Sequence, residues 1–423
     1  MDLSEEEISI LNGEKGETLA KVMKTIVMYG DTFGADRLVP VNGEYGHLVT
    51  SFGLSMMKPV YKLMDELISA GICSSQKFTV DPRPIDKDNV PAGLIKNLVF
   101  NYMYSKQDDY EKQLKKMGLL SEDGFTCTCY IKELGNRPGK GEIISWAESS
   151  AVVYANSVLG ARCNRNSGLI ELFGSILGKV PNFGLLTDEG RKATWIIEVQ
   201  TNKLPEAQVL GSVIGMKVME EVPYIKGLDQ HLGNSLNAQV KDYLKDMGAA
   251  TASNGAVGLY HVEGITPEAI ELGESLIQEN AKTYVIDELE LDFVKKNYPV
   301  MWKDSSARPQ LCFIGCPHLS IQQLETWVNA IESNLSIHKN DRVTIPTVLT
   351  TSPSVLKKFK ESPLFSKLEK MGISLSYICP LMYMNNPLCS KMPVITNSNK
   401  LRTYTTARYY TDVEILDQIT RRR

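Results

Sequence analysis

The last hundred residues restrict the fold of this chain more than any other segment does. Four short runs rich in β-branched residues occur there: "LCFIGC" at 311–316, "RVTIPTVLT" at 342–350, "SLSYIC" at 374–379 and "MPVITNS" at 392–398. Helical or turn sequence follows each of the first three runs. This alternation predicts an α/β unit with a mostly parallel sheet.

Thiol and polar side chains stand at the ends of these predicted strands. Cys316 and Cys379 each end a strand, and residues 397–400 follow the last one. Ser320 and Gln323 have the spacing of a capping box, which predicts a helix that begins just after Cys316. Because ligands bind outside the carboxyl ends of parallel strands, we expect these side chains to face one crevice.

The length of the chain predicts more than one domain. It has 423 residues, of which 43% are hydrophobic, whereas one domain usually holds about 100 to 200 residues. We expect an N-terminal α/β domain at 1–125 and a central domain at 126–305 whose Gly- and Ser-rich segments line the active site. A C-terminal α/β domain at 306–423 then carries two of the candidate cysteines.

Charge and hydropathy exclude some classes of partner. Lys and Arg number 46 against 50 Asp and Glu, a net charge of −4, and no long run of one sign occurs. We therefore expect no nucleic-acid groove and no binding to an anionic membrane surface. The N-terminus "MDLSEEEISI" is acidic, and no apolar run approaches the ~20 residues that span a bilayer, so a cytoplasmic protein is expected.

The eight cysteines are few for this length, and a reducing compartment argues against disulfides. Besides Cys316 and Cys379, a third thiol of interest is Cys127 or Cys129 in "TCTCY". Three distant thiols without a CxxC pair do not fit a structural zinc site. Two interpretations remain open: buried thiols that bind nothing, or ligands of an iron centre with one free position that acts on a substrate hydroxyl.

Four ordered motifs resemble one known family over nearly the whole chain. They are "SWAESSAVVYANSVLGAR" at 145–162, "FGLLTDEGRKATW" at 183–195, "SNGAVGLYHVEGITPEA" at 253–269 and "GCPH" at 315–318. Together they resemble the large subunit of the aconitase X family. The resemblance implies a multi-domain, aconitase-like α/β fold. It also implies a hydro-lyase that removes water from a small hydroxy acid.

The resemblance also implies a cofactor and a partner. The family's metal ligands match Cys127, Cys316 and Cys379, which would hold a 4Fe-4S or 2Fe-2S cluster or mononuclear iron. The family needs a small swivelling domain, and this chain ends in "DQITRRR" without one, so a small subunit that supplies a serine base is expected. Two further cysteines, Cys129 and Cys163, stand where the family has other residues. Each is either an inert substitution or an added thiol near the metal.

Candidate site residues follow from the polar loops and from the resemblance. An arginine fork or a lysine can bind the carboxylate of the substrate, and small polar groups can complete its contacts. The expected catalytic residues are Lys400, Asn156 and Ser157. The expected substrate-binding residues are His47, Gly53, Leu54, Ser55, Asp81, Pro82, Arg162 and Arg165, together with Lys400.

Structural roles compete with several of these functional ones. Arg162 and Arg165 could form surface ion pairs. His318 could hydrogen-bond to a carbonyl rather than bind metal. Glu148 and Asp188 could cap helices rather than transfer protons.

The loop "TVDPRPID" at 79–86 bears on the substrate. Asp81 and Asp86 flank Arg83 there, and two carboxylates would oppose binding of a phosphate. The sequence therefore favours cis-3-hydroxy-L-proline, or a related hydroxy acid, over the alternative, mevalonate 5-phosphate. A second alternative is a non-catalytic iron–sulfur sensor, although such a protein needs neither Lys400 nor the polar "AESSAVVYANS" segment.

Overall fold

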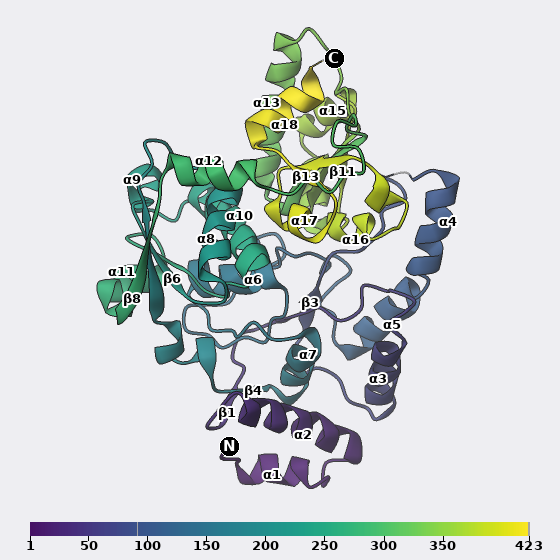
Figure 1. Cartoon of the computed structure of the whole chain (residues 1–423). Coiled ribbons are helices and arrows are strands. Elements are labelled where there is room, and N and C mark those ends of the chain that lie inside the picture. Colours follow the sequence, from purple (N-terminus) through teal and green to yellow (C-terminus); the bar gives the residue numbers. More distant parts are fainter. Residues whose placement is uncertain (91, 422–423) are drawn as a thin grey trace.

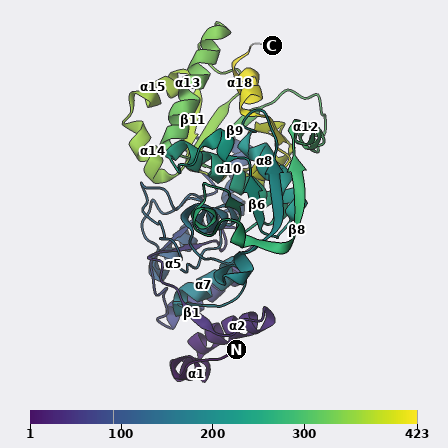
Figure 2. The ribbon, with the colours of Figure 1, turned by 90° about the vertical axis from the view of Figure 1, so that its left-hand side faces the viewer.

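Three sets of strands and the helices around them organise the computed structural model, which describes residues 1–90 and 92–421. The N-terminal helices lie at one end of the molecule and the C-terminal sheet lies at the other, in both perpendicular views (Figure 1, Figure 2). None of the helices within the described residues is long and apolar enough to cross a membrane.

The first set consists of two small sheets. β1 (Leu38–Pro40) pairs antiparallel with β4 (Lys179–Pro181), and β2 (Gly46–Leu48) pairs parallel with β3 (Phe78–Val80). The spacing of Ser4 and Glu7 predicts a capping box, and the structure has this box at the start of the first helix. The helices here are α1 (Glu5–Leu11), α2 (Glu17–Thr32), α3 (Lys58–Ser69), α4 (Leu94–Met103), α5 (Gln107–Met117), α6 (Ser149–Tyr154) and α7 (Gly168–Leu177), and a π-helical turn, Ala155–Leu159, continues α6.

The second set is a parallel sheet in the order β7-β6-β5-β8. Its two long helices, α8 and α10, pack closely because glycines line their contact. A Cβ added at Gly211 would lie 2.2 Å from the carbonyl oxygen of Met247, so a larger residue would push the helices apart. The elements are β5 (Ala193–Val199), α8 (Ala207–Val218), β6 (Pro223–Lys226), α9 (Asp229–Leu232), α10 (Ala238–Gly255), β7 (His261–Val262), α11 (Pro267–Leu272), β8 (Ile277–Ile286) and α12 (Glu288–Lys296).

The third set is the predicted α/β unit, a five-stranded parallel sheet in the order β11-β10-β9-β12-β13. Every residue of its central strand, β9, is buried, which explains the apolar run in the sequence. The elements are β9 (Leu311–Leu319), α13 (Ile321–Ile337), β10 (Thr347–Thr351), α14 (Pro353–Lys360), α15 (Pro363–Lys370), β11 (Ile373–Ser376), α16 (Pro380–Met384), β12 (Val394–Thr396), α17 (Asn399–Tyr404), β13 (Arg408–Tyr409) and α18 (Asp412–Thr420).

One prediction about β9 is wrong: the strand does not end at Cys316 but runs on to Leu319. The pairing of β9 with β10 shifts between Leu349 and Thr351, which marks an irregularity in the ladder. Gly315 lies at this irregularity with a φ of +104°, and a Cβ there would lie 2.6 Å from the carbonyl oxygen of Thr350. The next predicted feature, a capping box formed by Ser320 and Gln323, is confirmed at the start of α13.

Candidate active site

Three cysteines from distant parts of the chain line one cavity of about 70 Å³. Cys127 comes from the segment between α5 and α6, Cys316 from β9, and Cys379 from the residue that precedes α16. The remaining lining residues are Phe52, Asp81, Pro82, Glu148, Gly315, Pro317, His318, Pro380, Leu381, Met382 and Lys400.

Backbone contacts fix the positions of these cysteines. The N–H of His318 donates to the Cys127 sulfur at 3.5 Å, which ties the segment between α5 and α6 to β9. The N–H of Cys379 donates to the carbonyl oxygen of Arg83 at 2.9 Å. The loops that follow β3 and β11 are thereby held against each other at the cavity, as expected for the carboxyl ends of these strands.

Burial raises the pKa of all three thiols above the ordinary cysteine value. Cys316 is near both of the others, and its charge further raises the pKa of Cys127 and of Cys379. The positive charge of Lys400 acts to lower the pKa of each thiol. These sites therefore favour neutral thiols unless a cation stabilises the thiolates, which is the condition for pH-dependent binding of a soft metal.

Lys400 forms an ion pair with Glu148 in the cavity wall. Burial opposes the charge of Lys400, but Glu148, Cys316 and Cys127 together raise its pKa above the ordinary lysine value. Glu148 also caps α6, because its carboxylate accepts the N–H of Ala151 at 2.7 Å. Although burial opposes the charge of Glu148, Lys400 and these hydrogen bonds lower its pKa, so both partners stay charged.

Asp81 and His47 form a second polar pair, of which only Asp81 lines the cavity. The His47 Nε2 lies 3.7 Å from the Asp81 Oδ1, and neither atom has a hydrogen-bond partner among the described residues. The other ring nitrogen of His47 is bonded to the hydroxyl of Thr79 at 2.8 Å. Burial opposes charge on the ring, but Cys129 and Asp81 raise the pKa of His47 to about 10.

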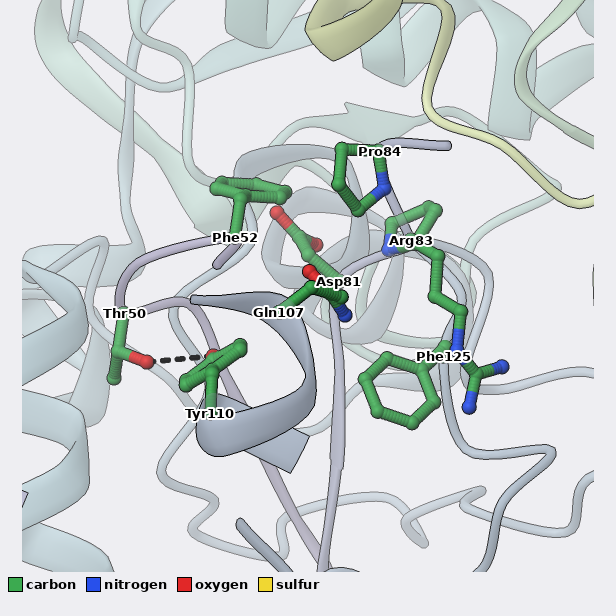
Figure 3. Close-up of a pocket in the computed structure, with 9 residues that line it drawn as sticks. Thr50, Phe52, Asp81, Arg83, Pro84, Gln107, Tyr110 and Phe125 are labelled. Atoms are coloured by element: carbon green, nitrogen blue, oxygen red, sulfur yellow. Dashed lines mark hydrogen bonds between the residues drawn. The ribbon is translucent and has the colours of Figure 1, made fainter. Parts of the chain in front are cut away.

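A small opening of about 10 Å³ adjoins the thiol cavity and shares Phe52, Asp81 and Pro82 with it. Figure 3 shows Asp81 and Gln107 together in this opening. The Oε1 of Gln107 has no partner among the described residues, so it is available to a polar ligand. Arg83 also lines the opening, but its guanidinium pairs with Glu111 through two hydrogen bonds of 2.8 and 3.0 Å.

The structure does not bring the two predicted arginines to the cavity. Arg162 pairs with Asp188 and donates to the carbonyl oxygen of Leu186, which is the surface ion pair that the sequence left open. Arg165 is half-buried and lies outside the cavity lining. Neither arginine is therefore placed to bind a ligand between the thiols.

Asn156 and Ser157 also lie outside the lining, because the π-helical turn points them into the interior. Asn156 bonds to the backbone of Cys163 and to the carbonyl oxygen of Gly258, and Ser157 accepts the N–H of Tyr260 at 2.9 Å. These bonds satisfy buried backbone groups and join the polar segment to the residues that precede β7.

The loop at Gly53, Leu54 and Ser55 packs beside the cavity without lining it. Gly53 has a φ of +70°, and a Cβ there would lie 2.7 Å from the Cα of Gln107. The N–H of Ser55 donates to the carbonyl oxygen of Met103 at 2.7 Å. This loop therefore positions its neighbour Phe52, which does line the cavity.

Among the predicted residues, the cavity thus brings together the three cysteines, Asp81, Pro82 and Lys400. Glu148 was predicted only as a possible cap or acid–base group, and its pairing with Lys400 could not be inferred from the spacing. His318 has both ring nitrogens engaged, by Thr126 at 2.9 Å and by the Ile378 carbonyl oxygen at 3.1 Å. Burial lowers its pKa to about 4, so the ring is a neutral support rather than a free ligand.

Within residues 1–90 and 92–421, no three His, Cys, Asp or Glu side chains are grouped so that they could hold a single metal ion. The three thiols instead surround a cavity. Thiolates are the usual ligands of iron–sulfur clusters, and a lysine cation beside them offsets the negative charge of such a group. The donor set of the cavity therefore fits a cluster of iron and sulfur.

Comparison with protein families gives three matches that follow one another along the chain. The model described as "Aconitase X first domain" matches residues 1–189. The second-domain model matches residues 193–296, and the third-domain model matches residues 309–418. In a search of solved structures, the chain resembles the holo-form of aconitase X from Thermococcus kodakaraensis, with a TM-score of 0.81, 30% identity and 99% of each chain covered.

Curated relatives carry two names. A "Phosphomevalonate dehydratase large subunit" from Thermococcus kodakarensis is 33% identical over 84% of this chain and 82% of that protein. A "Cis-3-hydroxy-L-proline dehydratase" from Hypocrea jecorina is 24% identical over 96% of this chain but only 65% of that longer protein. The three consecutive family matches, together with the relative that is 33% identical, show that this chain belongs to the aconitase X family.

Proposed function

We propose that this chain is the catalytic large subunit of a hydro-lyase that dehydrates mevalonate 5-phosphate. Membership of the aconitase X family and the dehydratase names of its relatives support the hydro-lyase class. The observation that carries the proposal is the cavity in which three thiols meet the Lys400–Glu148 pair. A sensor would need the thiols but not this buried cation.

Cys127, Cys316 and Cys379 would hold an iron–sulfur cluster. Three protein thiolates leave one position free, and the bound cluster would supply a Lewis acid for the substrate hydroxyl there. The sequence offered mononuclear iron as another option. A cluster agrees better with three thiols arranged around a cavity.

The residues of the chain then have distinct tasks in an elimination that breaks one C–H and one C–O bond, forms a C=C bond and releases water. The Lys400 Nζ binds the substrate carboxylate, and Glu148 keeps that ammonium charged and in place. The buried Asp81 Oδ1 lacks a partner among the described residues, so it can accept a hydrogen bond from the substrate hydroxyl. Phe52 and Met382 exclude water from the cavity.

The base that removes the proton next to the carboxylate would come from a small subunit. The name "large subunit" of the archaeal relative supports a second chain. Lys400 is the only cation among the described residues that line the cavity. The small subunit would therefore also provide donors for the second anion of the substrate, its phosphate.

The structure weakens the charge argument that favoured cis-3-hydroxy-L-proline. Asp86 does not line the cavity, because its carboxylate accepts hydrogen bonds from Ser376 at 2.7 Å and from Asn89 at 2.8 Å. Arg83 is paired with Glu111, so of the charged side chains in the 79–86 loop only Asp81 lines the cavity. The phosphomevalonate dehydratase relative has the higher identity, and the match covers more of its own length, 82% against 65%, which favours mevalonate 5-phosphate.

The test is a comparison of substrates by the reconstituted complex. The chain would be co-expressed with an aconitase X small subunit from the same genome, loaded with iron and sulfide under anaerobic conditions, and assayed by NMR for the unsaturated acid. We expect kcat/KM for mevalonate 5-phosphate to exceed that for cis-3-hydroxy-L-proline by at least ~100-fold. A higher kcat/KM for cis-3-hydroxy-L-proline would contradict the proposed substrate. If a cluster-loaded complex turned over neither compound, the proposed function would be wrong.

A further inference from the structure

One helix, α4, carries an unusual share of exposed apolar side chains. Eight large apolar side chains among the described residues are more than 70% exposed. Four of these eight lie on α4, namely Leu94 (91%), Ile95 (73%), Leu98 (71%) and Tyr102 (77%). A fifth, Met56, follows Ser55, whose N–H binds the C-terminal end of α4, whereas Leu289, Ile337 and Val413 lie singly on α12, α13 and α18.

The four α4 side chains form one continuous face, called here the apolar α4 face. Leu94, Leu98 and Tyr102 are spaced by four residues, and Ile95 precedes Tyr102 by seven, so all four fall within an arc of about 100°. Phe100 lies on the opposite side, where it is buried against Tyr383 with ring centroids 5.1 Å apart. The helix therefore has one apolar side in the core and another in solvent.

Helix α4 lies beside the candidate active site, and its apolar face is turned outward. The Tyr104 hydroxyl, just after α4, donates to the carbonyl oxygen of Met382 at 2.7 Å, and Met382 lines the thiol cavity. Phe100 and Tyr104 belong to the same apolar cluster as Cys316. Figure 1 shows α4 at the edge of the molecule, with one flank open. A partner bound to the apolar α4 face would thus cover the outer side of the helix whose inner side packs against the cavity wall.

We propose that the apolar α4 face is the docking surface for the small subunit, an inference that rests on the two-subunit enzyme proposed above. The proposed base must reach the cavity from another chain, and α4 is the exposed apolar element that packs against the cavity wall. The hydroxyproline dehydratase relative carries additional sequence on one polypeptide, which supports a further domain in this family.

Apolar anchors at helical spacing are a common way to bind a groove of a partner protein. The occupant is therefore expected to present an apolar groove that accepts Leu94, Leu98 and Tyr102. Large side chains near the centre of an interface usually contribute most of the affinity, so Leu98 and Tyr102 are the positions to test.

The experiment measures the affinity of the full chain for an aconitase X small subunit from the same genome, by calorimetry without substrate. Leu98→Asp should weaken binding at least ~10-fold, and Tyr102→Asp should act in the same direction. Leu289→Asp on α12 is the matched control, since it adds the same charge at an equally exposed apolar site, and it should leave Kd unchanged. Ile95→Lys, also on the face, repeats the test should Leu98→Asp reduce the Tm.

Three results would overturn the proposal: equal Kd for wild type and the α4 variants, no binding by the wild type, or a wild-type homodimer that Leu98→Asp dissociates. The last result would assign the face to a second copy. Because the binding experiment contains no substrate, its result does not depend on whether the proposed function is correct. The wild-type complex could dissociate on Leu98→Asp and yet not turn over mevalonate 5-phosphate. This result would support the docking surface and reject the proposed substrate.

Discussion

Lys400 and Glu148 lie 252 positions apart in the sequence, yet they form an ion pair in the wall of the thiol cavity. Their side chains are only 13% and 5% exposed. Glu148 belongs to the cap of α6, and Lys400 belongs to the first turn of α17. The pair thus joins the polar segment of the first part of the chain to the C-terminal sheet and keeps a cation beside the three cysteines.

Replacing Glu148 with Gln should destabilise the protein. The substitution leaves Lys400 charged and buried without its partner, which typically costs about 3–5 kcal/mol for a buried pair. The pKa of Lys400 should fall because Glu148 is the group that raises it most. A thermal unfolding experiment should show a lower Tm for Glu148→Gln. The exposed pair Lys140–Glu271 provides the control, and Glu271→Gln should leave Tm unchanged.

Lys400 and Arg162 should differ strongly in their effects on catalysis. In the reconstituted complex, Lys400→Gln removes the proposed carboxylate contact and should lower kcat/KM at least ~100-fold. Arg162→Gln breaks only the surface pair with Asp188 and should change kcat/KM less than ~3-fold. A large loss of activity in Arg162→Gln would mean that this side chain leaves Asp188 to reach the substrate.

Glu171 should make stability depend on pH. Burial raises the pKa of this carboxyl from 4.5 to about 8, so between these values the folded protein binds a proton that the unfolded chain releases. Stability should therefore be fully present below about pH 4.5 and fall by about 1.4 kcal/mol per pH unit as the pH rises toward 8. In Glu171→Gln this contribution disappears, because a neutral amide replaces the acid.

Urea unfolding at pH 5, 6, 7 and 8 checks this effect. The difference in unfolding free energy between Glu171→Gln and wild type should grow in favour of the variant as the pH rises. Glu325→Gln, on the exposed side of α13, is the control and should parallel the wild type. Parallel curves for Glu171→Gln and wild type would show that Glu171 is ionised in the folded protein.

The C-terminal sheet could be predicted because parallel, fully buried strands leave a strong local signal. β9, β10, β11 and β12 all overlap the four apolar runs, and both capping boxes occur where the spacing places them. The end of β9 was missed because it depends on a shift in its pairing with β10, which only the partner strand reveals. The domain boundaries after residues 125 and 305 stay a prediction.

The sequence predicted those residues of the cavity that residue type alone identifies. It did not predict which side chains the backbone orients toward the cavity. The family resemblance and the residue types single out Cys127, Cys316, Cys379 and Lys400, and the structure brings these four side chains together. Asn156 lies in an equally suggestive polar segment, but a π-helical turn points it away from the cavity. Neither that turn nor the pairing of Lys400 with Glu148 can be inferred from sequence spacing.

The central claim is that three particular cysteines hold an iron–sulfur cluster in this chain. Anaerobic reconstitution with iron and sulfide, followed by absorption spectroscopy and iron analysis, tests it without any partner or substrate. We predict a thiolate-to-iron charge-transfer band that is lost in Cys127→Ala, Cys316→Ala and Cys379→Ala but retained in Cys312→Ala, whose thiol is buried in β9 away from the cavity. Equal iron content and equal spectra in all four variants and the wild type would contradict the account.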